Sequence, residues 1–159
     1  MAKNEFSLAF NDVLEDKQLS KEVIISAIEH PSVVGPAEQL VRLGFDVQRI
    51  RVSRDGVVQI DHLRELLNRD TRLVSVMLAN NETRVMQPVS ELAELCAEAG
   101  VSLHTHAVQV VGKLPVHFRR LGVAAMSLAA HKFHGPRGIG ALILRSDVRL
   151  APTLFGGFQ

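Results

Sequence analysis

A lysine beside a glycine-rich stretch is the pattern in this sequence that points most directly to chemistry. Lys132 follows the apolar run AAMSLAA and His131, and within a few residues comes GPRGIG. A lysine at the end of a buried strand has its pKa lowered by desolvation, and its neutral amine can form a Schiff base with an aldehyde. A lone lysine is usually a solvated surface residue, so the whole motif HKFHGPRGIG is more specific than the lysine itself.

Unusual polar side chains follow four of the predicted strands. In open parallel sheets, ligands bind beyond the carboxyl ends of the strands, so these side chains are expected to meet at one edge. For any single residue, capping a helix or binding water is the simpler interpretation. The polar groups follow Ile28, Ala79, Leu103 and Ala130, and they are Glu29-His30, Asn80-Asn81-Glu82, His104-Thr105-His106 and His131-Lys132.

Short apolar runs alternate with amphipathic stretches along the whole chain. This alternation predicts a single α/β domain over residues 1–159, a mainly parallel sheet with flanking helices. Strands are predicted at 22–28, 45–52 and 71–79, and within VSLH, VAAMSLAA and IGALILR. Helices are predicted through 6–14, from Gly35-Pro36 to Leu43, after an N-cap at Asp61, and over 89–99.

Composition excludes several classes of protein. The 159 residues are 47% hydrophobic and 22% charged, which suits a globular domain with a core rather than a disordered tail. The net charge of +1 gives no basic field for nucleic acid, and a single cysteine excludes an internal disulfide. Because no run approaches the ~20 apolar residues of a membrane span and the N-terminus lacks a secretory core, we expect a cytoplasmic protein with no membrane partner.

Six motifs, from about Val23 to Leu144, give the sequence a family resemblance. In order and content they resemble the large, cofactor-binding domain of the cysteine desulfurases, which are pyridoxal-phosphate enzymes of aminotransferase class V. The fold that this implies is the large domain of a fold-type I transferase. The motifs are EH (29–30), RDG (54–56), SVMLANNE (75–82), QP (87–88), HTHAVQVVGKLPV (104–116) and HKFHGPRGIGALIL (131–144).

The resemblance implies a role for each matching residue. Lys132 matches the lysine that holds pyridoxal 5'-phosphate as a Schiff base, and His131 matches a neighbour that helps to bind the phosphate. His30 matches the imidazole that stacks on the pyridine ring and takes part in proton transfer. Asn81 and Gln109 match side chains that hydrogen-bond the cofactor. The implied reaction removes sulfur from L-cysteine and leaves alanine and a protein persulfide, in a dimer whose sites lie at the subunit interface.

Several departures from the family pattern lead us to expect little or no activity. The family places a carboxylate against the pyridine nitrogen at the position of His106, and hydroxyl residues at Val108 and Ala129. The glycine-rich phosphate loop, the catalytic-cysteine loop and the small C-terminal domain are not found in residues 1–159. Cys96 lies on an apolar helical stripe, which indicates a buried structural thiol. We therefore expect cofactor binding to be weak or lost, and any substrate to be an L-cysteine-like amino acid.

Two alternatives to a desulfurase-like domain remain open. The first is a non-catalytic remnant, a scaffold or a complementing subunit that keeps the fold without the chemistry. The second, less favoured, is a zinc or nickel site built from His104, His106, His131 and His134, since imidazoles suit those metals. If the desulfurase resemblance holds, the six predicted site residues should converge on one side of the sheet. They are His30, Asn81, His106, Gln109, His131 and Lys132.

Overall fold

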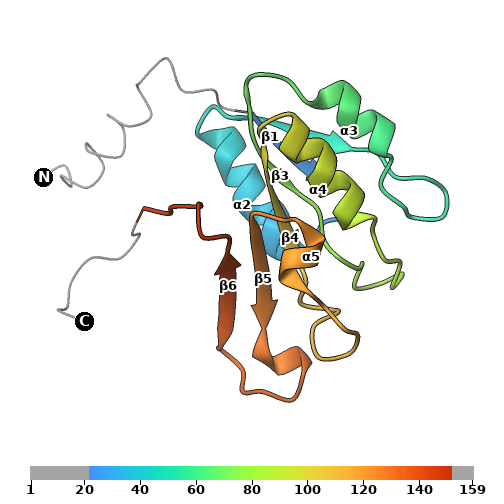
Figure 1. The fold of residues 1–159 in the computed structure, drawn as a ribbon, viewed down its shortest axis with the longest axis vertical. Coiled ribbons are helices and arrows are strands. Elements are labelled where there is room, and N and C mark those ends of the chain that lie inside the picture. The colour runs from blue at the N-terminus through green and yellow to red at the C-terminus, as the bar shows by residue number, and fades with distance from the viewer. Residues whose placement is uncertain (1–21, 152–159) are drawn as a thin grey trace, which may run out of the picture.

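One sheet forms the centre of the protein (Figure 1). The computed structural model describes residues 22–151, so the helix predicted through 6–14 lies outside the described residues. The six strands run in the order β2-β1-β3-β4-β5-β6. The first five are parallel and β6 is antiparallel to β5, which confirms the predicted mainly parallel sheet. The strands are β1 (Glu22–Ser26), β2 (Asp46–Ile50), β3 (Thr71–Ser75), β4 (Ser102–His106), β5 (Ala125–Ala129) and β6 (Gly140–Leu144).

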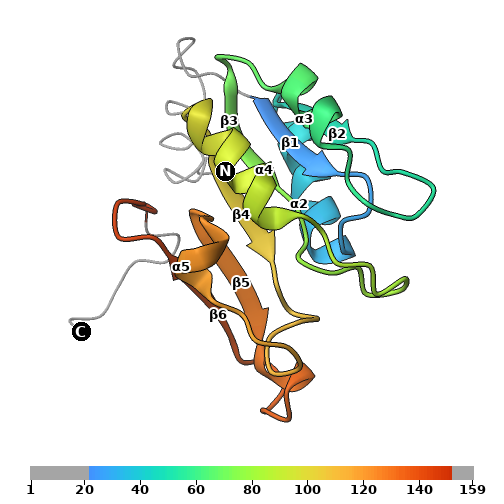
Figure 2. The same ribbon diagram turned by 45° about the vertical axis from the view of Figure 1, so that its right-hand side comes forward.

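Helices cover both faces of this sheet (Figure 2). On one face α2 packs over a small cluster that includes Val23, Ile25 and Ala37. On the other face a larger cluster contains Ile24 and Val74 together with buried residues of α3 and α4. Neighbouring residues of β1 thus point to opposite layers, as the pleat of a strand requires. The helices are α2 (Pro31–Arg42), α3 (Ile60–Leu66), α4 (Val89–Glu98), α5 (Phe118–Leu121) and the 3₁₀ turn η1 (Ala130–Lys132).

Two predicted helix starts were wrong. The helix predicted from Gly35-Pro36 begins at Pro31, because proline suits the first turn and the His30 side chain accepts a hydrogen bond from the Ser32 amide as the N-cap. Asp61 is not an N-cap either. It lies in the first turn of α3, where a negative charge is favourable, and Gln59 holds the cap position without a side-chain hydrogen bond.

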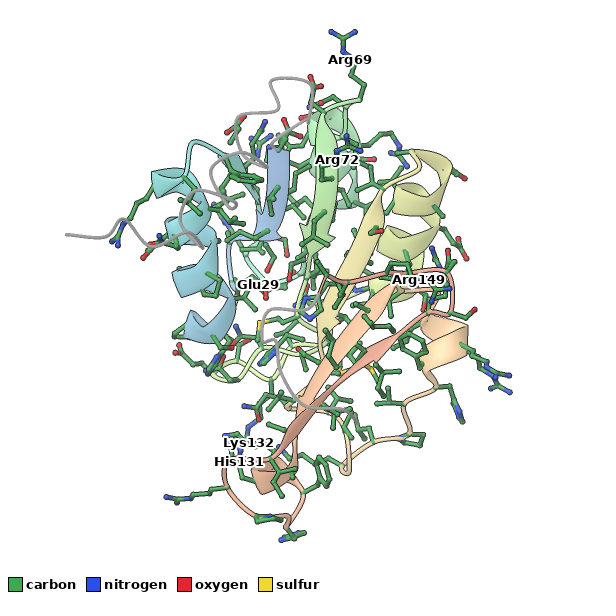
Figure 3. The ribbon with its side chains drawn as sticks, turned by 90° about the vertical axis from the view of Figure 1, so that its left-hand side faces the viewer. Glu29, Arg69, Arg72, His131, Lys132 and Arg149 are labelled. Carbon is green, nitrogen blue, oxygen red and sulfur yellow. The ribbon has the colours of Figure 1, made fainter. Side chains whose placement is uncertain are left out.

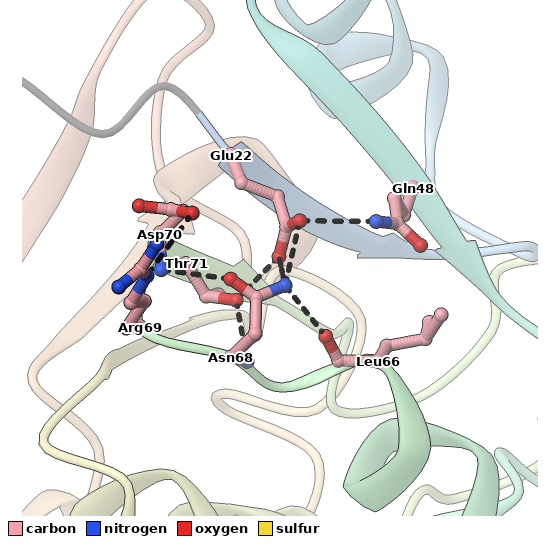
Figure 4. Close-up of polar contacts among 7 residues, drawn as sticks. All are labelled: Glu22, Gln48, Leu66, Asn68, Arg69, Asp70 and Thr71. Carbon is pink, nitrogen blue, oxygen red and sulfur yellow. Dashed lines mark hydrogen bonds and ion pairs between the residues drawn. The ribbon is translucent and has the colours of Figure 1, made fainter.

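A buried carboxylate joins the amino ends of three strands (Figure 4). Glu22 of β1 is 6% exposed and accepts a hydrogen bond from Gln48 Nε2 of β2 at 3.0 Å. Asn68 Nδ2 donates to both of its oxygens, at 3.0 and 2.8 Å, and the Thr71 hydroxyl of β3 donates as well. Glu22 therefore fixes this end of the sheet, far from the polar groups at the carboxyl ends.

Removing this carboxylate should destabilise the fold. The substitution Glu22→Ala leaves the buried Thr71 hydroxyl and the amides of Gln48 and Asn68 without this acceptor, so the free energy of unfolding should fall by about 1–3 kcal/mol in urea denaturation. Glu94→Ala on the exposed face of α4 is the matched control and should change it by less than about 0.5 kcal/mol. Equal losses in the two variants would contradict the role given to Glu22.

Candidate active site

The carboxyl ends of the parallel strands gather the polar residues singled out in the sequence. His30 follows β1, Asn81 follows the extended segment after β3, and His106 is the last residue of β4. His106 pairs in register with Ser127 of β5, and η1 follows β5 directly. The sequence predicted that the strand ends near His104, but β4 continues to His106, because its pairing with β5 extends through all three residues.

Two imidazoles from different strand ends face one another. The ring centroids of His30 and His106 lie 5.4 Å apart, with 20° between the ring planes. The Ser32 amide donates to His30 Nδ1 at 3.1 Å, so a neutral His30 carries its proton on Nε2. Capping α2 therefore also fixes the orientation of the ring that stands over His106.

The two histidines of β4 are hydrogen-bonded to serines on the neighbouring strands. His104 Nδ1 lies 2.9 Å from Ser75 Oγ of β3, and its Nε2 lies 3.1 Å from Ser127 Oγ of β5. His106 Nδ1 lies 3.1 Å from the same Ser127 Oγ. Burial, with a smaller contribution from His106, lowers the pKa of His104 to about 4. Burial and the proximity of His30 also lower the pKa of His106, so both rings are neutral at pH 7.

Asn81 and Gln109 line one cavity of about 470 Å³. The loop that carries Asn81 is held by Asn80, whose side-chain oxygen accepts hydrogen bonds from the Glu82 and Thr83 amides at 2.9 Å. On the opposite wall, the Lys113 amine donates to Gln109 Oε1 at 3.3 Å. The structure thus brings these two predicted site residues together, as it does His30 and His106.

Lys132 and His131 lie on η1, beyond the end of β5. Figure 3 shows them together at the end of the sheet opposite Arg69. Both side chains are exposed, so Lys132 has the solvated environment that is usual for a lysine rather than a desolvated one. The chain folds back tightly here, since a side chain at Gly135 would lie 2.6 Å from the Ala130 methyl group.

Glu29 is a feature of the site to which sequence reasoning gave no role. Its Oε1 accepts hydrogen bonds from Ser26 Oγ at 2.5 Å and from the Met77 amide at 2.7 Å, whereas Oε2 is buried without a partner. Burial raises its pKa to about 7, against two hydrogen bonds that lower it. The signal in the sequence was a carboxylate directly after an apolar strand, and the hydrogen bond from Met77 ties the loop before His30 to the segment that follows β3.

Neither a metal nor a reactive thiol is supported by the described residues. Across residues 22–151, no group of three or more His, Cys, Asp or Glu side chains is arranged to hold a metal ion. Cys96 is buried in α4, and burial raises the pKa of its thiol to about 12. A thiol with that pKa is not a nucleophile at neutral pH.

Comparison with known proteins decides the family. The family model described as "Aminotransferase class-V" matches residues 2–159. The chain belongs to this family. Its curated relatives include cysteine desulfurase IscS of Dictyoglomus turgidum, 42% identical over 87% of this chain, and a cysteine desulfurase of Cereibacter sphaeroides, 46% identical over 87%. These matches cover 35% and 36% of those proteins, so the chain spans about a third of their length.

Solved structures agree with the sequence relatives. A "NIFS-LIKE PROTEIN" matches with a TM-score of 0.85 at 34% identity, over 96% of this chain and 42% of that one. "SspA in complex with cysteine" matches with a TM-score of 0.84 at 32% identity, over 94% and 43%. The resemblance to cysteine desulfurases and the fold-type I architecture are confirmed. In the part of the chain that is described, no helix has the length and apolar character to cross a membrane.

Pyridoxal phosphate is the cofactor of this family, and the residues present can be tested for their fit to its flat ring. Stacked rings in contact lie about 3.5 Å apart, so near-parallel rings with centroids 5.4 Å apart are offset sideways. A flat ring beside the edge of His106 could therefore lie under the face of His30. Two amides line a cavity and an amine lies on η1, so the types of donor that the cofactor needs are present after separate strands.

The two shifted pKa values predict opposite effects of pH on stability. Glu29 binds a proton more tightly in the folded chain, so its contribution to stability is lost as pH rises from about 4.5 to about 7. His104 binds a proton less tightly in the folded chain, so its contribution is lost as pH falls from about 6.5 to about 4. Each difference corresponds to about 3 kcal/mol. The slope from Glu29 opposes that from His104, to which the lowered pKa of His106 adds, so the wild-type profile should be shallower than that of a variant without the Glu29 carboxyl.

The substitution Glu29→Gln should reveal the loss of stability that His104 causes as pH falls. This variant should lose about 3 kcal/mol of unfolding free energy between pH 6.5 and pH 4, measured by urea denaturation at a series of pH values. Glu94→Gln, at an exposed position, is the control and should keep the shallow profile of the wild type. Parallel profiles for Glu29→Gln and the wild type would contradict the buried state of Glu29.

Proposed function

We propose that this chain is a cysteine desulfurase-like domain that binds pyridoxal phosphate weakly through Lys132 and does not turn over L-cysteine by itself. The observation that carries the proposal is the neutral imidazole of His106 at the end of β4. A family member would hold a carboxylate there, according to the resemblance. A neutral ring can exchange a hydrogen bond with a pyridine nitrogen, but it supplies no negative charge to keep that nitrogen protonated.

The other side chains of the site favour the binding of pyridoxal phosphate more than the turnover of L-cysteine. When bound, pyridoxal phosphate supplies an aldehyde that condenses with amines and a ring that accepts electrons from the amino acid. His30 would cover the face of the ring, Asn81 and Gln109 would offer amide hydrogen bonds, and Lys132 would offer its amine. His131 would approach the phosphate, while Ala129 offers that phosphate no hydroxyl.

Turnover also needs a thiol that accepts sulfur. Cys96 is the one cysteine of the sequence, and its burial and raised pKa leave it unsuited to that role. The substrate class, an L-cysteine-like amino acid, follows from the relatives. A homodimer or a complementing subunit remains a prediction from the resemblance, and a purely scaffolding role one from the departures. The cytoplasmic location remains a prediction from the sequence pattern.

A spectroscopic titration tests the binding half of the proposal. Added pyridoxal phosphate should saturate the chain only above about 10 μM, because the phosphate gains no hydroxyl donor at position 129. Borohydride should then fix the cofactor on the peptide that contains Lys132, and Lys132→Ala should abolish this label. Lys113→Ala, which removes the other lysine of the described residues, should retain it. Tight stoichiometric binding, or labelling that survives Lys132→Ala, would contradict the proposal.

Restoring a negative charge tests the other half. His106→Asp should raise transamination of L-cysteine, which needs no sulfur acceptor, by about tenfold or more, since a carboxylate favours the protonated pyridine nitrogen by at least about 1.4 kcal/mol. His106→Asn, which has a similar size and no charge, is the control and should not gain activity. A loss of activity in a folded His106→Asp variant that still binds cofactor would show that His106 is an adapted group.

A further inference from the structure

We propose that Ser127 couples the two histidines of β4, so that the neutral rings of His104 and His106 carry their protons on the same-named nitrogen. His104 is then a positioning residue: it determines whether His106 Nε2 presents a proton or a lone pair at the carboxyl edge of the sheet. The coupling itself does not depend on the proposed function. Only the effect of the coupling on a bound pyridine ring depends on the proposed function.

Four side chains on three adjacent strands form the coupled chain. It runs from Ser75 of β3 to His104 Nδ1 at 2.9 Å, from His104 Nε2 to Ser127 of β5 at 3.1 Å, and from Ser127 back to His106 Nδ1 at 3.1 Å. The Ser75 end is closed, because Ser75 is 3% exposed. This series of hydrogen-bonded side chains therefore does not reach solvent at Ser75. Its open end is the His106 ring.

The single proton of a hydroxyl produces the coupling. If His104 carries its proton on Nδ1, its Nε2 must accept from Ser127, whose oxygen then accepts from His106 Nδ1. If His104 carries its proton on Nε2, it donates to Ser127, whose hydroxyl is free to donate to His106 Nδ1. The first arrangement leaves a lone pair on His106 Nε2, and the second leaves a proton there.

The mixed arrangements are unfavourable. With the proton of His104 on Nδ1 and that of His106 on Nε2, Ser127 would have to donate two hydrogen bonds with one proton. In the reverse mixture both rings donate to Ser127, and its own hydroxyl proton loses its acceptor within the chain. Each mixture loses a hydrogen bond of this partly buried network, which favours the matched arrangements.

The state of His106 Nε2 selects what can bind beside it. His106 is 8% exposed, and its Nε2 has no hydrogen-bond partner among the described residues. A proton there would suit an unprotonated ring nitrogen, and a lone pair would suit a protonated one. This reading for pyridoxal phosphate rests on the proposed function. The proton positions can be measured on the chain without cofactor, so a failure of one is distinguishable from a failure of the other.

Long-range ¹H–¹⁵N correlation spectra of the histidine rings test the coupling at pH 7.5. In the wild type, His104 and His106 should both be protonated on Nδ1 or both on Nε2. His62 and His30 are internal references, because the Arg51 and Ser32 amides donate to their Nδ1 atoms and both should carry the proton on Nε2. A wild type with His104 protonated on Nδ1 and His106 on Nε2, or the reverse, would overturn the proposal.

Two variants break the chain at different points. In Ser127→Ala, His104 should donate from Nδ1 to Ser75 while His106 protonates on the more accessible Nε2, which is a mixture disfavoured in the wild type. In Ser75→Ala, His104 should protonate on Nε2, because a buried N–H without an acceptor is costlier than a lone pair. His106 should then protonate on Nε2 as well, although Ser75 does not touch it. His106 protonated on Nδ1 in Ser75→Ala, or matched rings in folded Ser127→Ala, would overturn the coupling.

Discussion

The desolvation of two imidazoles on β4 is the constraint on which the site depends. A buried imidazolium would lack solvent and a nearby carboxylate to offset its charge, so His104 and His106 stay neutral at pH 7. A neutral ring offers one donor and one acceptor: Ser75 and Ser127 pair both nitrogens of His104, and Ser127 pairs Nδ1 of His106. The hydrogen-bond pattern of this edge and its lack of negative charge both follow from that neutrality.

Stability at this edge is a balance between opposite titrations. Glu29 is buried beside the loop that carries His30, and its pKa is raised to about 7. Protonation of Glu29 and deprotonation of His104 both remove charge from the same end of the sheet. Glu29 is therefore neutral below about pH 7 and His104 is neutral above about pH 4. Between these values both groups are uncharged, which favours the folded edge of the sheet.

The strands and the candidate motifs could be predicted from the sequence because they depend on local pattern. The β-branched run EVIIS and the apolar run AMSLA form β1 and β5, and the helical stripe of Val89, Leu92 and Cys96 forms the buried face of α4. The carboxyl-edge placement of His30 and His106 follows from parallel topology. The proximity of these two residues could therefore be predicted from the sequence pattern alone.

What could not be predicted depends on packing between distant segments. The exposure of Lys132 depends on what packs around η1, which no local feature of HKFHGPRGIG reveals. The true start of α2 depends on the His30 side chain as a cap, and the pairing of His104 with Ser75 and Ser127 depends on the register of three strands. The burial of Glu29 depends on the distant Met77 amide that donates to it, which its position after a strand does not reveal.

The central claim is that His106 is a neutral group where the family resemblance places a carboxylate. It is tested most directly by following the His106 ring signals with pH in NMR spectra of the intact chain. The account predicts an apparent pKa below the ordinary value of 6.5, so that the ring carries no charge at pH 7. A ring that titrates above pH 7 would contradict it, because His106 would then bring positive charge to the sheet edge and its burial would not control its protonation.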